Sequence, residues 1–151
     1  MKVKATGPRD LLADRRGTLA IEFALLLPAL VLLLMGVFDY ASLSYDTMEV
    51  NAAAHAGADY ALRNGWNSSG VQTAVTSSTT IAVTATPAPT LSSGCIVNGA
   101  LQTTTSTTCP SGGTPGSYAI VNAKTSFTPL AIWSSFVMPS TISAQAAVRL
   151  N

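Results

Sequence analysis

The residues of this 151-residue chain whose side chains could take part in chemistry are one acid within an apolar run, two cysteines and one histidine. Glu22 is the single charged residue of the 21-residue apolar run 18–38. A carboxylate in such a run is costly when ionised, so it needs a cation as partner. Cys95 and Cys109 could form a disulfide or bind a metal, and His55 could act as a base or a ligand. Each of these functions requires further groups close by in the fold.

The pattern around the histidine and the cysteines argues against catalysis and metal binding. His55 stands in an alanine-rich segment, far in sequence from either cysteine. Two thiols with thirteen residues between them and one distant imidazole are too few ligands at the wrong spacing for a metal. The sequence contains no nucleophile–base pattern and no phosphate-binding glycine motif. It therefore predicts no catalytic residue, no metal and no cofactor.

Composition excludes two further classes of protein. The chain is 48% apolar and 10% charged with a net charge of +1, unlike a highly charged disordered chain. Five of its eight cations lie within the first sixteen residues, so no basic face for nucleic acid is expected. Thirteen of the fifteen charged residues precede Asn64, whereas 30 of the last 88 residues are Ser or Thr. The chain thus divides into a charged and apolar front and a neutral, hydroxyl-rich back.

The apolar run 18–38 predicts a membrane-spanning helix. At about 1.5 Å per residue it measures roughly 30 Å, the thickness of the hydrocarbon core of a bilayer. Five cations precede it against two acids, and only acids follow it before residue 50. This asymmetry predicts a cytoplasmic N-terminus, with everything after Asp39 outside.

Two alternatives to an assembling helix stay open. A removable signal peptide would use the small-x-small site at Ala54-His55-Ala56, but about sixteen residues separate that site from the apolar run. A plain signal anchor is the second alternative. In it, Glu22 would reach toward water or pair with Arg15 or Arg16, one to two turns earlier on the helix.

The residues around Glu22 resemble a processing site. Two arginines precede Gly17, and Glu22 is the fifth residue after that glycine. This resembles the prepilin-peptidase site of type IVb (Flp) pilins, in which cleavage follows the glycine and the fifth mature residue is Glu. The resemblance implies cleavage between Gly17 and Thr18, which releases a basic leader, residues 1–17. The new amine of Thr18 would then be the missing cation for Glu22, within one helix or between neighbouring subunits.

The wider segment RRGTLAIEFALLLPALVLLLMGVFDYA, residues 15–41, is similar to the N-terminal signature of TadE-like proteins of the tight-adherence pilus system. Major Flp pilins have Tyr after the Glu and are much shorter, so Phe23 and the chain length favour a minor pseudopilin. A weaker similarity covers residues 118–130 and 141–149, and none covers 66–116. The matching positions in the front segment are Ala20, Glu22, Phe23, Ala24, Leu27, Pro28, Gly36, Asp39 and Tyr40.

The resemblance implies an assembly component of a tight-adherence (Flp) pilus that supports adhesion and biofilm formation. It would be a single-pass protein of the bacterial inner membrane with a periplasmic C-terminal domain, incorporated in the extracellular pilus. Its implied partners are membrane lipid, the prepilin peptidase, other pilins and pseudopilins, and the inner-membrane assembly platform, with no nucleic acid. The alternative function is a signal-anchored periplasmic binding or adhesion module that never enters a pilus.

The predicted fold is α+β and pilin-like. A transmembrane and stalk helix is expected over residues 18–64, about 70 Å long, with Asn64-Gly65 as its stop signal. Ala53, Gly57 and Ala61 recur every four residues, and we expect this stripe of small residues to pack on the chain's own sheet. Residues 65–151 are expected to form the extracytoplasmic β-rich domain.

Within this domain, the alternation of β-branched and polar residues predicts five short strands. Asn98-Gly99 predicts a tight hairpin turn, and residues 103–116 predict a mobile loop of low complexity. Because the domain is expected in an oxidising compartment, Cys95 and Cys109 are expected to form a disulfide. The five predicted strands are residues 71–75, 79–84, 117–124, 130–137 and 141–148.

Overall fold

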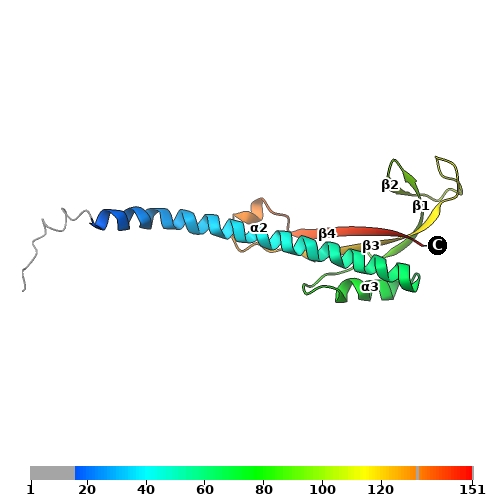
Figure 1. The fold of residues 1–151 in the computed structure, drawn as a ribbon, viewed down its shortest axis with the longest axis horizontal. Coiled ribbons are helices and arrows are strands. Elements are labelled where there is room, and N and C mark those ends of the chain that lie inside the picture. Colours follow the sequence, from blue (N-terminus) through cyan, green and yellow to red (C-terminus); the bar gives the residue numbers. More distant parts are fainter. Residues whose placement is uncertain (1–15, 132, 151) are drawn as a thin grey trace, which may run out of the picture.

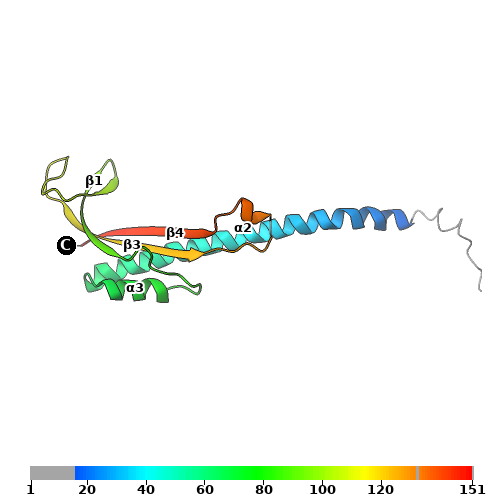
Figure 2. The same cartoon turned by 180° about the vertical axis from the view of Figure 1, so that it is seen from behind.

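The structure, a computed structural model, describes residues 16–131 and 133–150. A long helix runs the length of the molecule, and an antiparallel sheet and a short helix pack against its C-terminal half (Figure 1). Its N-terminal half projects beyond the sheet, as the view from behind also shows (Figure 2). The predicted α+β class is therefore confirmed. Of the predicted leader, residues 1–15 lie outside the described residues.

Helix α2 comprises Arg16–Asn64, 49 residues in all. Leucine and alanine, two strong helix formers, dominate its sequence. Pro28 lies inside the helix and lacks the N–H that would bond one turn earlier, yet the helix continues through it. Gly65 follows with a φ of 77°, the left-handed conformation that commonly ends helices. The predicted stop at Asn64-Gly65 is thus confirmed.

Helix α3, Ser68–Ser77, replaces the first predicted strand. Asn67 is its N-cap, and the side-chain oxygen of Asn67 accepts a hydrogen bond of 3.1 Å from the backbone N–H of Gly70. Val71 and Val75 are one turn apart and both are fully buried where α3 packs on α2. The prediction of a strand at 71–75 is wrong because the buried positions recur every four residues rather than every two.

The sheet has four strands in the order β2-β1-β3-β4, each antiparallel to its neighbours. β3 (Gly116–Ser126) and β4 (Thr141–Leu150) contain the predicted strands 117–124 and 141–148, which are confirmed. β1 (Thr90–Val97) and β2 (Ala100–Thr103) form the predicted hairpin, with positive φ at Asn98 and Gly99. The first half of β1 was not predicted, since Thr-Leu-Ser-Ser-Gly has little β-branched or aromatic character.

Two other strand predictions are wrong. Residues 79–84 make a single isolated bridge, in which Thr84 pairs with Lys124 of β3, and the prolines at 87 and 89 interrupt further pairing. Residues 130–137, apart from the undescribed residue 132, form a turn and the short 3-10 helix η1, Ser134–Phe136. Contacts with α2, described below, hold this segment in its turn conformation.

The small residues of α2 let the sheet approach closely, as predicted. Ala53 and Ala61 are fully buried, and a Cβ at Gly57 would lie 2.6 Å from Val75 Cγ2 and 2.8 Å from Val121 Cγ1. α3 and β3 therefore meet at Gly57, where no side chain fits. The predicted packing of the small-residue stripe on the chain's own sheet is confirmed. It leaves the domain on one side of the helix, and the opposite side without a partner from β3, β4 or α3.

Candidate functional site

The N-terminal half of α2 is apolar and exposed. Its most apolar 18-residue window has a mean hydropathy of 2.5, and none of that window is buried within the described part of the protein. By length and composition this helix could cross a membrane. Leucine side chains that would be costly in water are between 44% and 75% exposed over residues 25–34. An unpartnered surface of this size points to lipid or other helices as its environment.

The predicted cleavage site lies at the start of α2. The helix begins at Arg16, so the backbone of Gly17 and of Thr18 is in its first turn. Glu22 is four residues after Thr18, one helical turn away and on the same side of the helix. Side chains on a helix point back toward its N-terminus, so the Glu22 carboxylate extends toward the position of Thr18. The pairing of Glu22 with a Thr18 amine stays a prediction, with which the spacing of one helical turn is compatible.

Glu22 and Phe23 are exposed, and Phe23, the residue after Glu22, is the first that lines an apolar groove of about 400 Å³ on the helix surface. Ala29 and Leu33, seven and eleven positions after Glu22, lie on the same side of the helix as Glu22. The groove therefore continues from the acid for three helical turns. Its lining residues are Phe23, Leu26, Leu27, Ala29, Leu30 and Leu33.

Asp39 fastens the sheet domain to the other side of α2. The loop that links β3 to β4, residues 127–140 and called the β3–β4 loop below, returns along α2. One carboxylate oxygen of Asp39 accepts the Leu130 N–H at 2.8 Å, and the other accepts the Ala131 N–H at 3.0 Å. The second oxygen also accepts the Ser134 hydroxyl at 2.6 Å. Asp39 and Ser134 are both almost fully buried, so this polar contact lies inside the fold.

These hydrogen bonds set the ionisation of Asp39, which lies just beyond the apolar run 18–38. The Ser134 hydroxyl, followed by the backbone N–H groups of Leu130 and Ala131, holds the pKa of Asp39 below its ordinary value. Burial alone would raise the pKa of this carboxyl and only partly opposes the hydrogen bonds. Asp39 is therefore a charged acceptor that three donors of the loop satisfy.

Gly36 gives the loop a second point of contact one turn before Asp39. A Cβ at Gly36 would lie 2.6 Å from Trp133 Cη2 and 2.9 Å from Trp133 Cζ2. The indole can approach the helix this closely only because the residue is glycine. A cavity of about 270 Å³ remains beside the indole, lined by Leu32, Met35, Leu130, Ala131 and Trp133.

Sequence reasoning missed the roles of Asp39, Ser134 and Trp133. Gly36 and Asp39 were noted as positions of the family signature, but nothing local indicates that they bind a loop about ninety residues later. The one available signal is Pro129 and Pro139, which bracket the segment 130–138 and disfavour a regular strand there.

The two cysteines meet at the far end of the domain. A disulfide joins Cys95 of β1 to Cys109, with their Cα atoms 5.7 Å apart. It ties the segment between β2 and β3 to the sheet, and a turn in which the Gly112 N–H donates to the Cys109 carbonyl lies next to it. His55 is exposed on α2, and no group of three or more metal-ligating side chains occurs among residues 16–131 and 133–150.

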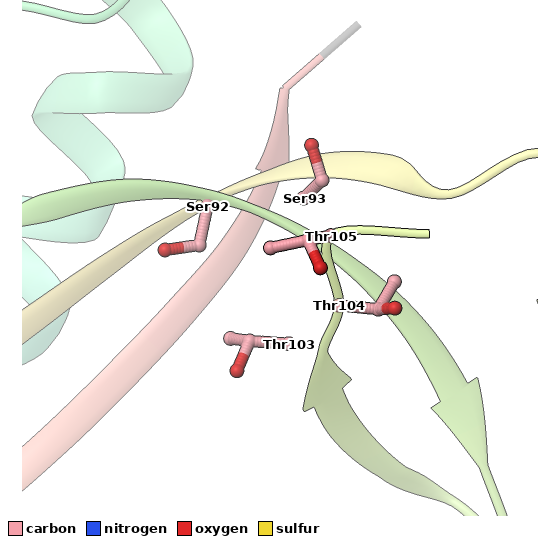
Figure 3. A pocket seen from close by; sticks show the side chains of 5 residues that line it. All are labelled: Ser92, Ser93, Thr103, Thr104 and Thr105. Atoms are coloured by element: carbon pink, nitrogen blue, oxygen red, sulfur yellow. The ribbon is translucent and has the colours of Figure 1, made fainter. Parts of the chain in front are cut away.

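A hollow of about 780 Å³ near this end is lined by hydroxyl side chains only (Figure 3). Ser92 and Ser93 come from β1, and Thr103, Thr104 and Thr105 come from the end of β2 and the residues after it. Ligand pockets usually combine apolar or aromatic walls with a few polar groups. This lining has neither an aromatic nor a charged side chain, so it offers little to hold a ligand in place.

Comparison with known proteins finds one family similarity, in the N-terminal helix. Residues 17–59 match the family model described as TadE-like protein. No curated protein and no solved structure matches the chain. The matched segment contains Gly17, Glu22, Gly36 and Asp39, and it suggests involvement in a tight-adherence (Tad) pilus system. Over this segment, which forms most of α2 and less than a third of the chain, the protein is similar to TadE-like proteins.

Proposed function

We propose that this protein is a minor pseudopilin of a tight-adherence (Flp, type IVb) pilus. The prepilin peptidase cleaves it between Gly17 and Thr18, and the mature helix from Thr18 onward anchors it in the inner membrane. It then joins other pilins and pseudopilins by lateral insertion of that helix into a bundle at the assembly platform. Its contribution to adhesion and biofilm formation is non-covalent assembly rather than catalysis.

The observation that carries this proposal is the two-sided arrangement of α2. Leu30 in the apolar groove and Asp39 under the β3–β4 loop are nine positions apart, which turns them through about 180° on a helix. The chain's own domain therefore occupies one side of the helix, and the groove beside Glu22 is left for another helix. A groove that starts at a charged residue fits a neighbouring helix better than lipid, because lipid chains cannot satisfy a carboxylate.

The pairing of Glu22 with the Thr18 amine would set the register in which neighbouring helices assemble. In a low-dielectric bundle, an amine and a carboxylate attract strongly, and a subunit out of register would lose the pairing between helices. The pairing forms within one helix before assembly and between helices in the filament. Cleavage is a prerequisite, because the backbone nitrogen of Thr18 carries no charge while Gly17 is attached.

Site-specific photo-cross-linking in membranes tests this proposal. A photoreactive residue at Leu30 should cross-link to another pilin-type subunit, since Leu30 lines the groove. Leu25 is the matched control: it is also exposed, and five positions of helix turn it about 140° away from Leu30. We expect Leu25 to give lipid adducts in most molecules. Lipid adducts alone at both positions, in cells that assemble pili, would favour the plain signal anchor instead.

The alternative function, a membrane-anchored module that binds polysaccharide or a partner protein, has less support. Its natural site would be the hydroxyl-lined hollow of Ser92, Ser93 and Thr103–Thr105. Without aromatic or charged groups in its lining, the hollow lacks the anchors that ligand pockets use. We therefore assign the main function to the exposed side of α2.

A further inference from the structure

We propose that the β3–β4 loop is a second membrane contact, which inserts its apolar side chains into the lipid interface where α2 emerges from the bilayer. This inference rests on the proposed function only in that it requires residues 18–38 to span a membrane. It concerns a different surface, formed by Leu130, Trp133, Phe136 and Val137, which meets α2 at Gly36 and Asp39, roughly 21 to 26 Å along the helix from Glu22.

These four side chains are more exposed than soluble domains usually allow for a cluster. Phe136 is 87% exposed, Val137 81%, Leu130 71% and Trp133 46%. They occur within eight consecutive positions of one loop that is fixed on α2, so they are exposed on the same part of the molecule. The chain has no ionisable side chain between Lys124 and Arg149, so the loop carries no charge that lipid would have to accommodate.

The loop is fixed at one height along α2. The three hydrogen bonds to the Asp39 carboxylate and the contact of the Trp133 indole with Gly36 hold it from two sides. The Phe127 N–H donates to the Ser140 carbonyl at 3.0 Å and closes the base of the loop. The exposed side chains therefore project from a supported turn, and their level relative to the helix is set by Gly36 and Asp39.

That level coincides with the end of the apolar run. Gly36 is the third residue from the C-terminal end of the run 18–38, so Trp133 packs against its last turn. A bilayer that covers residues 18–38 would end at the loop. Tryptophan and tyrosine are enriched at this boundary, and Tyr40, exposed on α2, stands at the same level. The patch is thus continuous with the surface that faces lipid.

Lipid rather than a second protein is the occupant favoured by these positions. The groove beside Glu22 lies nearer the N-terminus of α2 and extends to Leu30, on the side turned away from Asp39, and it is the surface with a charge that needs a protein partner. The loop patch has no charged or buried polar group directed outward that would recognise a protein. An uncharged loop with a tryptophan, the strongly exposed apolar residues Phe136 and Val137, and a position beside a helix that could span a membrane has the chemistry of an interfacial anchor.

Tryptophan quenching by brominated lipid tests this directly. The chain has two tryptophans, and Trp66 follows the end of α2 at Asn64, which is roughly 42 Å along the helix from Gly36, so it serves as an internal control. The full chain is reconstituted in phosphatidylcholine–phosphatidylglycerol vesicles at low protein density, with bromine near the headgroup end of the acyl chains. Trp66→Phe isolates Trp133, and Trp133→Phe isolates Trp66.

We expect the emission of Trp133 to fall by roughly half or more, and that of Trp66 by less than about a tenth, because only Trp133 reaches the interface. Bromine near the chain ends should quench Trp133 less. If Trp66→Phe does not fold, the difference between the wild type and Trp133→Phe gives the same quantity. Phe136→Ser with Val137→Ser should reduce the quenching of Trp133, whereas Leu62→Ser, an exposed position at the far end of α2, should not.

Two outcomes would overturn the inference, and they differ in what else they affect. If the protein resists alkaline extraction from the vesicles but Trp133 is not quenched, the loop contact is wrong while the membrane anchor stands. Cross-links from Phe136 to a second protein subunit would add that the patch is a protein interface. If alkaline treatment releases the protein, the spanning helix itself is wrong, and both proposals fail.

Discussion

At the scale of single residues, two carboxylates on one helix have opposite surroundings. Asp39 is buried, and three donors from a distant loop satisfy it. Glu22 is exposed in an apolar segment, beside the groove of Phe23 and Leu26. The buried acid has all its hydrogen-bond donors within the fold, whereas the acid on the unpartnered apolar surface needs a cation, which we propose is the Thr18 amine of its own or a neighbouring helix. The two acids therefore call for different tests.

The Glu22→Gln variant distinguishes a carboxylate that pairs with a cation from a carboxylate that the membrane only tolerates. The amide keeps the shape of the side chain, so insertion and cleavage after Gly17 should persist while association with other pilin subunits weakens. The loss is bounded by the cost of leaving one partner of a buried ion pair, about 3 kcal/mol. Co-purification with pilin subunits measures it. A plain anchor predicts unchanged function and insertion that is easier by up to about 3 kcal/mol, so wild-type yield together with normal piliation would defeat the pairing.

Asp39 makes the attachment of the β3–β4 loop dependent on pH. Because folding lowers the pKa of this carboxyl, its contribution is fully present above the ordinary aspartate value of about 4. The contribution is lost as the pH falls through the lower folded-state value. The loop itself presents no ionisable side chain to Asp39. Acidification should therefore release the Trp133 indole from Gly36.

The fluorescence emission of Trp133, measured in the Trp66→Phe variant, reports this release. We expect a red shift in acid for the protein with Asp39, and a shifted emission already at neutral pH for Asp39→Asn, with little further change in acid. Asp59→Asn, an exposed acid on the same helix, is the control and should behave like the parent. The same acid-induced shift in Asp39→Asn as in the parent would assign the pH dependence to another group.

At the scale of elements, the sequence predicts those parts whose signal is local. The helix Arg16–Asn64 follows from its composition and its glycine stop, and the β1–β2 hairpin follows from Asn98-Gly99. Residues 71–75 and 130–137 were predicted as strands because their residue types favour extended backbone. Tertiary contacts decide otherwise: Val71 and Val75 pack on α2, and Asp39 binds two N–H groups of the second segment. Residue propensities that favour helix and strand about equally carry no information on such contacts.

Helix α3 depends on its cap. Asn67→Ala removes the acceptor for the Gly70 N–H and should lower the free energy of unfolding by about 1 kcal/mol. Asn67→Asp retains an acceptor and adds a negative charge at the helix N-terminus, so it should keep stability at or above that of the parent. Chemical denaturation of the detergent-solubilised protein measures both. Equal stability of the alanine and parent proteins would mean that packing of Val71 and Val75 alone specifies α3.

The disulfide between Cys95 and Cys109 carries a prediction about the cellular compartment of the domain as well as about its structure. In protein recovered from membranes under non-reducing conditions, both thiols should resist alkylation. Replacement of both by serine should cost about 3 kcal/mol, because the bridge closes a loop of about 15 residues. Two reactive thiols in the non-reduced protein would remove the bridge and bring the outside location of the domain into question.

At the scale of the whole molecule, two sides of helix α2 have different neighbours. The domain packs against the side of α2 that carries Asp39 and Gly57, while the groove around Leu30 stays open on the other, with Glu22 at its edge. The sequence predicts the open side, since its signals are a run of apolar residues and a spacing from Gly17 to Glu22. It does not predict the level at which the β3–β4 loop meets α2, because that level depends on a contact between residues about ninety positions apart.

The central claim is that Thr18 becomes the N-terminus of an assembling helix. Intact-mass measurement of the membrane-extracted protein, with and without the prepilin peptidase, tests it most directly. We predict that residues 1–17 are absent from the mature chain when the peptidase is active, and retained when it is not. Gly17→Val should retain them in both cases. A chain that still begins at Met1 in peptidase-proficient cells, or one that begins at Gly57 after signal-peptide removal, would contradict the account.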